Sequence, residues 1–243
     1  IIEFCDQLLD VAGFTDYGPN GLQVPGEAEV GKVVTGVSAH LDLIERAVAA
    51  GADMLIAHHG LFWDFHPRAL SEAMAERLRV ALDARLSIAG YHLPLDAHPE
   101  IGNNALIRDA LGFDPSPEPL GEVRGRSVGV VGRSSSAVGL DELIDRVRSV
   151  TGREPLVFRS GPERVHSIGI ESGAGASAIH EAAALGLDAF LTGEPAEHVM
   201  ADAAEGGVSF IAAGHYATET FGIRRLGERL AERFGIEHEF IGI

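Results

Sequence analysis

The sequence is poor in the residues on which several classes of protein depend. It contains a single cysteine, Cys5, so no disulfide can form within the chain, and a thiolate-rich metal site is excluded. Any bound metal would therefore depend on His, Asp, Glu and water. No apolar run approaches the roughly 18 to 20 residues that a membrane span requires, and the N-terminus shows no basic leader. We expect a cytoplasmic protein that does not cross a membrane.

Basic residues are also scarce. Nineteen Lys and Arg stand against 36 Asp and Glu, which gives a formal net charge of −17. Because this charge would repel a phosphate backbone at long range, the composition disfavours nucleic acid as a partner. A small anionic substrate would need a local positive centre.

Apolar residues and glycine are plentiful. The 243 residues are 46% hydrophobic, and 30 of them are glycine. This composition excludes disorder, collagen and coiled coil. Apolar runs that end in glycine alternate with amphipathic segments, which predicts an α/β fold with mostly parallel or mixed sheets flanked by helices. The expected strands cover residues 33–38, 53–57, 87–90, 127–131, 155–158, 165–171, 189–192, 209–213 and 237–243. The expected helices cover residues 41–50, 69–86, 101–111, 140–150, 177–185, 196–204 and 218–234.

The proline-rich residues 114–119 predict a linker between two domains. We place the first domain at residues 1–116 plus 217–243, and the second at 117–216. The two halves also share a pattern, in which a strand, a helix and a strand lead on to His-x-x-x-acid, at His92–Asp96 and at His215–Glu219. This pattern predicts a duplicated α/β unit, the alternative being that any two strand-helix-strand units look alike.

Two histidines follow a strand that is expected to be buried. His58 and His59 would lie at its carboxyl end, where open α/β sheets bind ligands. Neighbouring strand residues point to opposite faces, so both can serve one site only if the chain turns at Gly60 or if two metal ions lie side by side. The alternative is that one histidine bonds backbone carbonyls and the other is solvated.

Two further strand ends offer metal ligands. His215 and Glu219 are spaced i, i+4 at the expected start of a helix, so their side chains share one face. Asp96 stands in an expected exposed loop that Pro94 stiffens. Three strand ends therefore carry nitrogen or carboxylate ligands, and the sequence favours a divalent metal site.

The remaining candidates are weaker. His92 and His98 flank Asp96 and could orient it, relay a proton or face solvent, and Glu194 could act as a base or cap a helix opening at Pro195. The other histidines have no partner at ligand spacing and are treated as background: His40, His66, His166, His180, His198 and His238.

A glycine-rich segment offers a competing interpretation. Gly173 to Ala178 fits G-x-G-x-x-A, the pattern of a dinucleotide-binding turn, and Glu194 follows at roughly the ribose-binding offset. Pro195 directly after that glutamate argues against it. We expect no dinucleotide cofactor, and the helix would either hold one phosphate or simply turn tightly.

Five segments carry a resemblance to a known family. They are residues 16–24 (DYGPNGLQV), 56–63 (IAHHGLFW), 92–104 (HLPLDAHPEIGNN), 191–194 (LTGE) and 213–219 (AGHYATE). In this order they resemble the Nif-three-like dinuclear metal-centre family, often labelled GTP cyclohydrolase 1 type 2 homologue, in its short bacterial form. The family usually has an aromatic residue or Asp before the Asn of its first motif, where this chain has Pro19. That departure leaves the role of residues 17–24 open.

The resemblance implies two similar α/β domains, a pair of divalent ions in the cleft between them, and a ring-shaped homohexamer. At the matching positions it implies five metal ligands, with Glu219 bridging: His58, His59, Asp96, His215 and Glu219. Ligands of this kind suit Zn, Mn or Fe, and five ligands shared by two ions leave positions for water and substrate.

Such a centre indicates a metal-dependent hydrolase of a small anionic metabolite, because two ions lower the pKa of water and attract an anion. The family label suggests the ring opening of GTP, and a phosphoester would suit two metals equally well. The alternative is a non-enzymatic metal-binding regulator or scaffold. Nucleic-acid processing within a ring is the third possibility, which the acidic charge disfavours.

Overall fold

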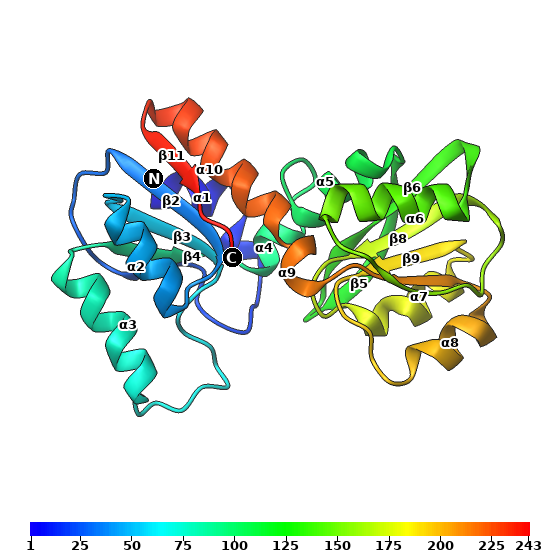
Figure 1. Cartoon of the computed structure of the whole chain (residues 1–243), viewed down its shortest axis with the longest axis horizontal. Helices are drawn as coiled ribbons and strands as arrows, with labels where there is room; N and C mark the ends of the chain where they lie inside the picture. Colours follow the sequence, from blue (N-terminus) through cyan, green and yellow to red (C-terminus); the bar gives the residue numbers. More distant parts are fainter. The chain divides into compact units, whose positions relative to one another are not determined.

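The chain is an α/β protein with two mixed sheets flanked by helices. A computed structural model describes residues 1–243 (Figure 1). Its contacts form two compact units, residues 1–95 with 222–243 (unit 1) and residues 96–221 (unit 2). No helix combines the length and the apolar character that a bilayer crossing needs.

The sheet of unit 1 has five strands in the order β1-β4-β3-β2-β11. They are β1 (Gly21–Val24), β2 (Lys32–Ser38), β3 (Met54–His59), β4 (Ser87–Gly90) and β11 (Glu237–Phe240). Strands β4, β3, β2 and β11 run parallel, and β1 pairs antiparallel with β4. The central strands are almost continuously buried, as expected of parallel strands covered on both faces.

Helices cover both sides of this sheet. They are α1 (Ile2–Leu8), α2 (Leu41–Ala49), α3 (Glu72–Asp83), and, apart from its first two residues, α10 (Thr220–Phe234). Leu43 and Ile44 of α2 pack with Ala81 of α3 on the sheet residues Leu55 and Ile88. Helix α10 runs along the opposite side (Figure 1).

The sheet of unit 2 has six strands in the order β5-β6-β8-β9-β10-β7. They are β5 (Asp114–Val123), β6 (Arg126–Gly139), β7 (Leu156–Phe158), β8 (Arg164–Glu171), β9 (Ala189–Thr192) and β10 (Ser209–Ala212). Strands β8, β9 and β10 are parallel to one another, and the other pairs are antiparallel.

The two faces of this sheet carry different helices. Helices α5 (Asn103–Leu111) and α6 (Leu140–Thr151) bury Ile107 and Leu143 against one face. Helices α7 (Ile179–Ala184) and α8 (Val199–Gly206) bury Ile179, Val199 and Ala203 against the other. Figure 1 shows the two pairs on opposite sides of the strands.

The expected linker at residues 114–119 is wrong, because this segment forms most of strand β5. Asp114 to Ser116 pair with β6, the register then shifts, and pairing resumes at Leu120. β5 is the edge strand of its sheet, where a residue without an amide hydrogen can face away from the ladder. Proline at alternate positions thus marks an edge strand in this chain.

Both units follow one connection scheme. In unit 1, β2-α2-β3-α3-β4 gives the strand order β4-β3-β2, with β1 antiparallel beside β4. In unit 2, β8-α7-β9-α8-β10 gives the order β10-β9-β8, with β7 antiparallel beside β10. The residues that follow β3 and β4 therefore occupy places equivalent to those that follow β9 and β10.

Candidate metal centre

His58 lies at the end of β3 and is completely buried. Its Nδ1 lies 2.9 Å from the backbone carbonyl oxygen of Tyr91. Because a carbonyl oxygen only accepts, Nδ1 carries a hydrogen, which leaves Nε2 as the ring nitrogen that a metal ion would bind. This is the arrangement that metal-binding histidines adopt, in which one ring nitrogen donates to a carbonyl and the other binds the ion.

His59 and His92 lie beside His58. The ring centroids of His58 and His59 are 4.8 Å apart, and that of His92 is 5.2 Å from His58. Each of the three histidines offers a ring nitrogen within 4.8 Å of the others. His59 Nδ1 lies 3.1 Å from the hydroxyl of Ser38, its partner across the sheet. Unit 1 thus brings the two predicted histidines together and adds His92, whose role the sequence left open.

Asp16 orients His92, and this role of Asp16 was not predicted from the sequence. His92 Nδ1 donates to Asp16 Oδ1 at 2.7 Å, while Oδ2 accepts from the side chain of Asn20 and the amide of Leu93, both at 2.9 Å. Burial opposes ionisation of the Asp16 carboxyl, but hydrogen bonds and charge from His92, with the amide of Asn20, hold its pKa below the usual value. A negative Asp16 fixes the hydrogen of His92 on Nδ1, as for His58. The signal was its place in the motif at residues 16–24.

Gln23 explains the rest of that motif. Its Oε1 accepts from the amide of Leu61 at 2.7 Å, and its Nε2 donates to the carbonyl of Pro19 at 2.7 Å. A Cβ atom at Gly60 would lie 2.3 Å from Gln23 Nε2, and one at Gly90 would lie 2.7 Å from it. A side chain at either position would have to displace Gln23, which braces the turn that follows the histidines.

His215 and Glu219 form the corresponding group in unit 2. His215 opens the short helix α9 (His215–Thr218), directly after β10 and a turn at Gly214 with φ +97°. Its Nε2 lies 3.1 Å from Glu219 Oε1, and its Nδ1 lies 2.8 Å from Glu194 Oε1. The hydrogen bond with Glu219 outweighs burial and, with the charges of both glutamates, raises the pKa of His215 to about 9. A cation is therefore favoured between these carboxylates, and a divalent ion would displace the imidazole proton.

Asp96 is buried, which corrects the expectation of an exposed loop. Asp96 is the last residue of the short helix α4 (Leu93–Asp96) and is 6% exposed. Its Oδ1 accepts hydrogen bonds from Asn103 Nδ2 at 2.8 Å and from Ser172 Oγ at 3.1 Å. Pro94 stands in the first turn of this helix, where proline is well tolerated.

The turn after β8 brings the three predicted ligands of unit 2 together. Ser172 contacts Asp96, and its neighbour Gly173 lies against the other two. A Cβ atom at Gly173 would be 2.3 Å from Glu219 Oε1 and 3.2 Å from His215 Nε2. Gly173 also has a φ of +64°, which favours glycine. Its place in the G-x-G pattern is accounted for by this packing.

The structure gives hydrogen-bond partners to Glu194 and His98, whose roles the sequence left open. Glu194 caps no helix, since the next helix begins at Val199, and its carboxylate orients His215. His98 Nδ1 accepts hydrogen bonds from the amides of Glu100 and Ile101, each at 3.1 Å, so this ring stabilises a turn. Asn103 and Ser172 orient Asp96.

The donor chemistry of both groups suits a divalent transition metal. Unit 1 contributes imidazole nitrogens, and unit 2 contributes an imidazole and two buried carboxylates. In each unit an outer carboxylate holds the Nδ1 of one histidine, Asp16 for His92 and Glu194 for His215. Outer carboxylates of this kind fix ring orientation and raise ligand basicity.

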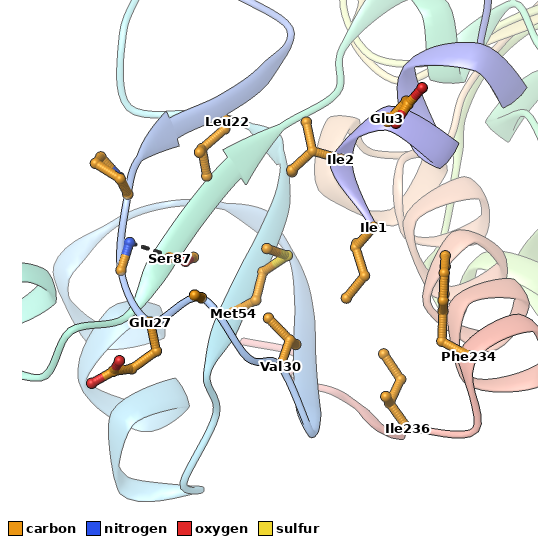
Figure 2. Close-up of a pocket in the computed structure, with 13 residues that line it drawn as sticks. Ile1, Ile2, Glu3, Leu22, Glu27, Val30, Met54, Ser87, Phe234 and Ile236 are labelled. Atoms are coloured by element: carbon orange, nitrogen blue, oxygen red, sulfur yellow. Dashed lines mark hydrogen bonds between the residues drawn. The ribbon is translucent and has the colours of Figure 1, made fainter.

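A pocket elsewhere in unit 1 has a different character. Figure 2 shows it lined mainly by apolar side chains, among them Ile1, Met54 and Phe234. Its charged side chains are Glu3 and Glu27, and it contains no histidine. It offers neither the nitrogen ligands nor the positive charge that the predicted chemistry requires.

Similarity to known proteins extends along the whole chain. The family model described as Duf34/NIF3 (NGG1p interacting factor 3) matches residues 1–243. A Deinococcus radiodurans protein named GTP cyclohydrolase 1 type 2 homolog is 41% identical over 241 residues, which cover 99% of this chain and 91% of that protein. An Escherichia coli protein of the same name is 40% identical over 247 residues, covering 99% and 96%.

Solved structures of similar proteins also match nearly the whole chain. Protein ybgI, described as of unknown function, superposes with a TM-score of 0.93 at 40% identity, covering 100% of this chain and 96% of that one. TTHA1606 from Thermus thermophilus gives a TM-score of 0.85 at 34% identity, covering 98% and 95%. The chain therefore belongs to the Duf34/NIF3 family, as its sequence motifs indicated.

Proposed function

We propose that this chain binds two divalent metal ions through ligands from both units and uses them to hydrolyse a small anionic metabolite. The proposed ligands are His58, His59, Asp96, His215 and Glu219. The observation that carries the proposal is the repeated arrangement of a histidine held at Nδ1 by a carboxylate beside further ligand groups, once in each unit.

When bound, the ions would supply positive charge for an anionic substrate and lower the pKa of water, as hydrolysis at neutral pH requires. The protein's own residues supply orientation. His58 is fixed by the Tyr91 carbonyl, Asp96 by Asn103 and Ser172, and His215 by Glu194. His92 has its hydrogen on Nδ1, held by Asp16, and is placed to accept a proton at Nε2 during turnover.

The proposal defines the substrate by its class, a small anionic metabolite. The chain carries a net charge of −17, so an anion would be attracted only by a local positive centre. Relatives bear the name GTP cyclohydrolase 1 type 2 homolog, and GTP is therefore the first compound to test. A panel of phosphoesters is the second, because two metal ions suit phosphoester hydrolysis equally well.

Paired variants test this function. His215→Ala and Glu219→Ala should lower the metal content measured by elemental analysis and abolish turnover together, while circular dichroism shows a retained fold. His166→Ala provides the control, since it removes an exposed histidine of the same unit. Turnover that persists in a variant lacking metal would contradict the proposal. Metal loss with no hydrolysis of any tested compound by the wild type would favour the regulator or scaffold.

We also propose, from the family resemblance, that the chain assembles into a homohexamer. Sedimentation velocity measures this state directly. A mass of six chains supports the hexamer, and a monomer at micromolar concentration contradicts it.

A further inference from the structure

A second group of metal-ligand side chains lies on the surface of unit 2 and shares no residue with the candidate metal centre. It consists of His180 on α7, His198 just before α8, and Asp202 in the first turn of α8. The expectation that neither histidine has a partner at ligand spacing is wrong, because Asp202 follows His198 by four residues and lies beside His180. His198 and Asp202 have the same i, i+4 spacing as His215 and Glu219, and His180 reaches them from a neighbouring helix.

The three side chains converge on one point. His198 Nδ1 lies 2.5 Å from Asp202 Oδ2, and His180 Nε2 lies 3.4 Å from the same oxygen. The two imidazole rings are nearly parallel, with an interplanar angle of 8° and centroids 6.0 Å apart. Their ligand atoms all lie within 4.8 Å of one another. Zinc ligands at ~2.0 to 2.2 Å in a tetrahedral site stand roughly 3.3 Å apart, so small side-chain rotations would suffice.

The backbone beneath this group is fixed. Ile179 precedes His180, Val199 follows His198, and Ala203 follows Asp202, and all three neighbours are completely buried in the same core. The backbone positions of the three ligands are therefore set before a cation arrives, which lowers the entropy cost of binding. The histidine side chains themselves are 65% and 46% exposed, so an ion can reach them from solvent.

We propose that His180, His198 and Asp202 form a separate surface site for a divalent transition metal such as Zn²⁺. Two imidazoles and one carboxylate favour zinc over Mg²⁺ or Ca²⁺, which prefer oxygen ligands. Three protein ligands leave a fourth position for water. A bound ion would join α7 to α8 and so stabilise this face of the sheet by mass action.

Zinc binding to the full-length protein tests the site. Chelator-treated wild type, His180→Ala, Asp202→Asn and the control His166→Ala are dialysed against buffered Zn²⁺, and the bound zinc is measured by mass spectrometry. We expect His180→Ala and Asp202→Asn to bind one Zn²⁺ per chain fewer than wild type and His166→Ala at the same free zinc. Outer ligand partners alone change metal affinity by about 10- to 100-fold, so loss of a ligand should weaken binding at least tenfold.

Asp202→Asn retains both imidazoles and nearly the same shape, so its loss of zinc cannot be attributed to unfolding. Hydrogen exchange gives the second readout, since Zn²⁺ should slow exchange in α7 and α8 of the wild type but not of Asp202→Asn. Equal zinc content in all four proteins, or equal exchange with and without Zn²⁺, would overturn the proposal. Neither outcome depends on turnover, so this site can fail while the proposed hydrolase stands, and the reverse.

Discussion

At the scale of single residues, short contacts between a few polar groups determine what the histidines can do. His58 donates to a carbonyl, and His92 and His215 are each held by a carboxylate at Nδ1. The sequence indicated the histidines, because they follow predicted strands. It could not indicate that Asp16 serves His92, because 76 residues separate them and only the folded sheet brings them together.

Gly173 offers a test of the group in unit 2. Gly173→Ala places a methyl group 2.3 Å from Glu219 Oε1 at a position with φ +64°. Gly186→Ala is the matched control, since Gly186 has φ +65° and nothing within 4 Å of its Cβ position. Both variants should lose about 1 to 2 kcal/mol of unfolding free energy through backbone strain. Only Gly173→Ala should also lose bound metal, as measured by elemental analysis. Equal metal content in the two variants would contradict the proposed role of Glu219.

Glu171 should make stability depend on pH. Burial, with the nearby carboxylates of Asp96 and Glu181, raises its pKa from 4.5 to about 8. Between these values the native state binds more protons than the unfolded state, so this residue's contribution to stability is complete below pH 4.5 and is lost as the pH rises to 8.

In the metal-free protein we therefore expect Glu171→Gln to gain stability relative to wild type as the pH increases, by on the order of 1 to 3 kcal/mol above pH 8. Urea unfolding from pH 5 to 9 measures the difference. Glu163→Gln, at an exposed position, serves as the control, and its unfolding free energy should change with pH as that of the wild type does. A Glu171→Gln curve that also runs parallel to wild type would show that this carboxyl titrates normally.

At the scale of helices and strands, the alternation of the fold was predictable because buried parallel strands are short apolar runs, and the helices between them are amphipathic. The errors came from segments whose tertiary surroundings override local pattern. Prolines at residues 114–119 occupy an edge strand rather than a linker. The helix expected at residues 69–86 spans only Glu72–Asp83, where Ala81 is buried, and Leu70 and Leu82 are 59% and 55% exposed.

Gly90, at the end of β4, lies against Gln23 and the turn after β3, and we expect a side chain there to reduce stability. A Cβ atom there would lie 2.7 Å from Gln23 Nε2 and 3.0 Å from the Cα of Gly60, so Gly90→Ala must displace the brace beneath the histidines. Overpacking of this kind costs about 1 to 3 kcal/mol, and we expect that loss in urea unfolding. Gly31→Ala is the control, because its Cβ position meets only Asp53 Oδ2, at an ordinary contact distance of 3.6 Å. A loss in Gly90→Ala no larger than in the control would show that Gln23 moves without cost.

At the scale of the whole molecule, two units with one connection scheme each place imidazole or carboxylate groups after parallel strands. The alternation of apolar runs with amphipathic segments predicted an α/β chain, and the motifs predicted its family. The proposed sharing of metal ions by both units was implied by that resemblance and could not be obtained from residue patterns. The net charge of −17 makes such a positive centre the condition for binding any anion.

The most direct test of that sharing is a crystal structure of the metal-loaded protein, with the ions located by anomalous scattering. The account predicts two peaks ~3.5 to 4 Å apart, with His58 and His59 of unit 1 and Asp96, His215 and Glu219 of unit 2 all within ~2.3 Å of an ion. Peaks bound by the residues of one unit alone, or no peak at these five residues, would contradict it.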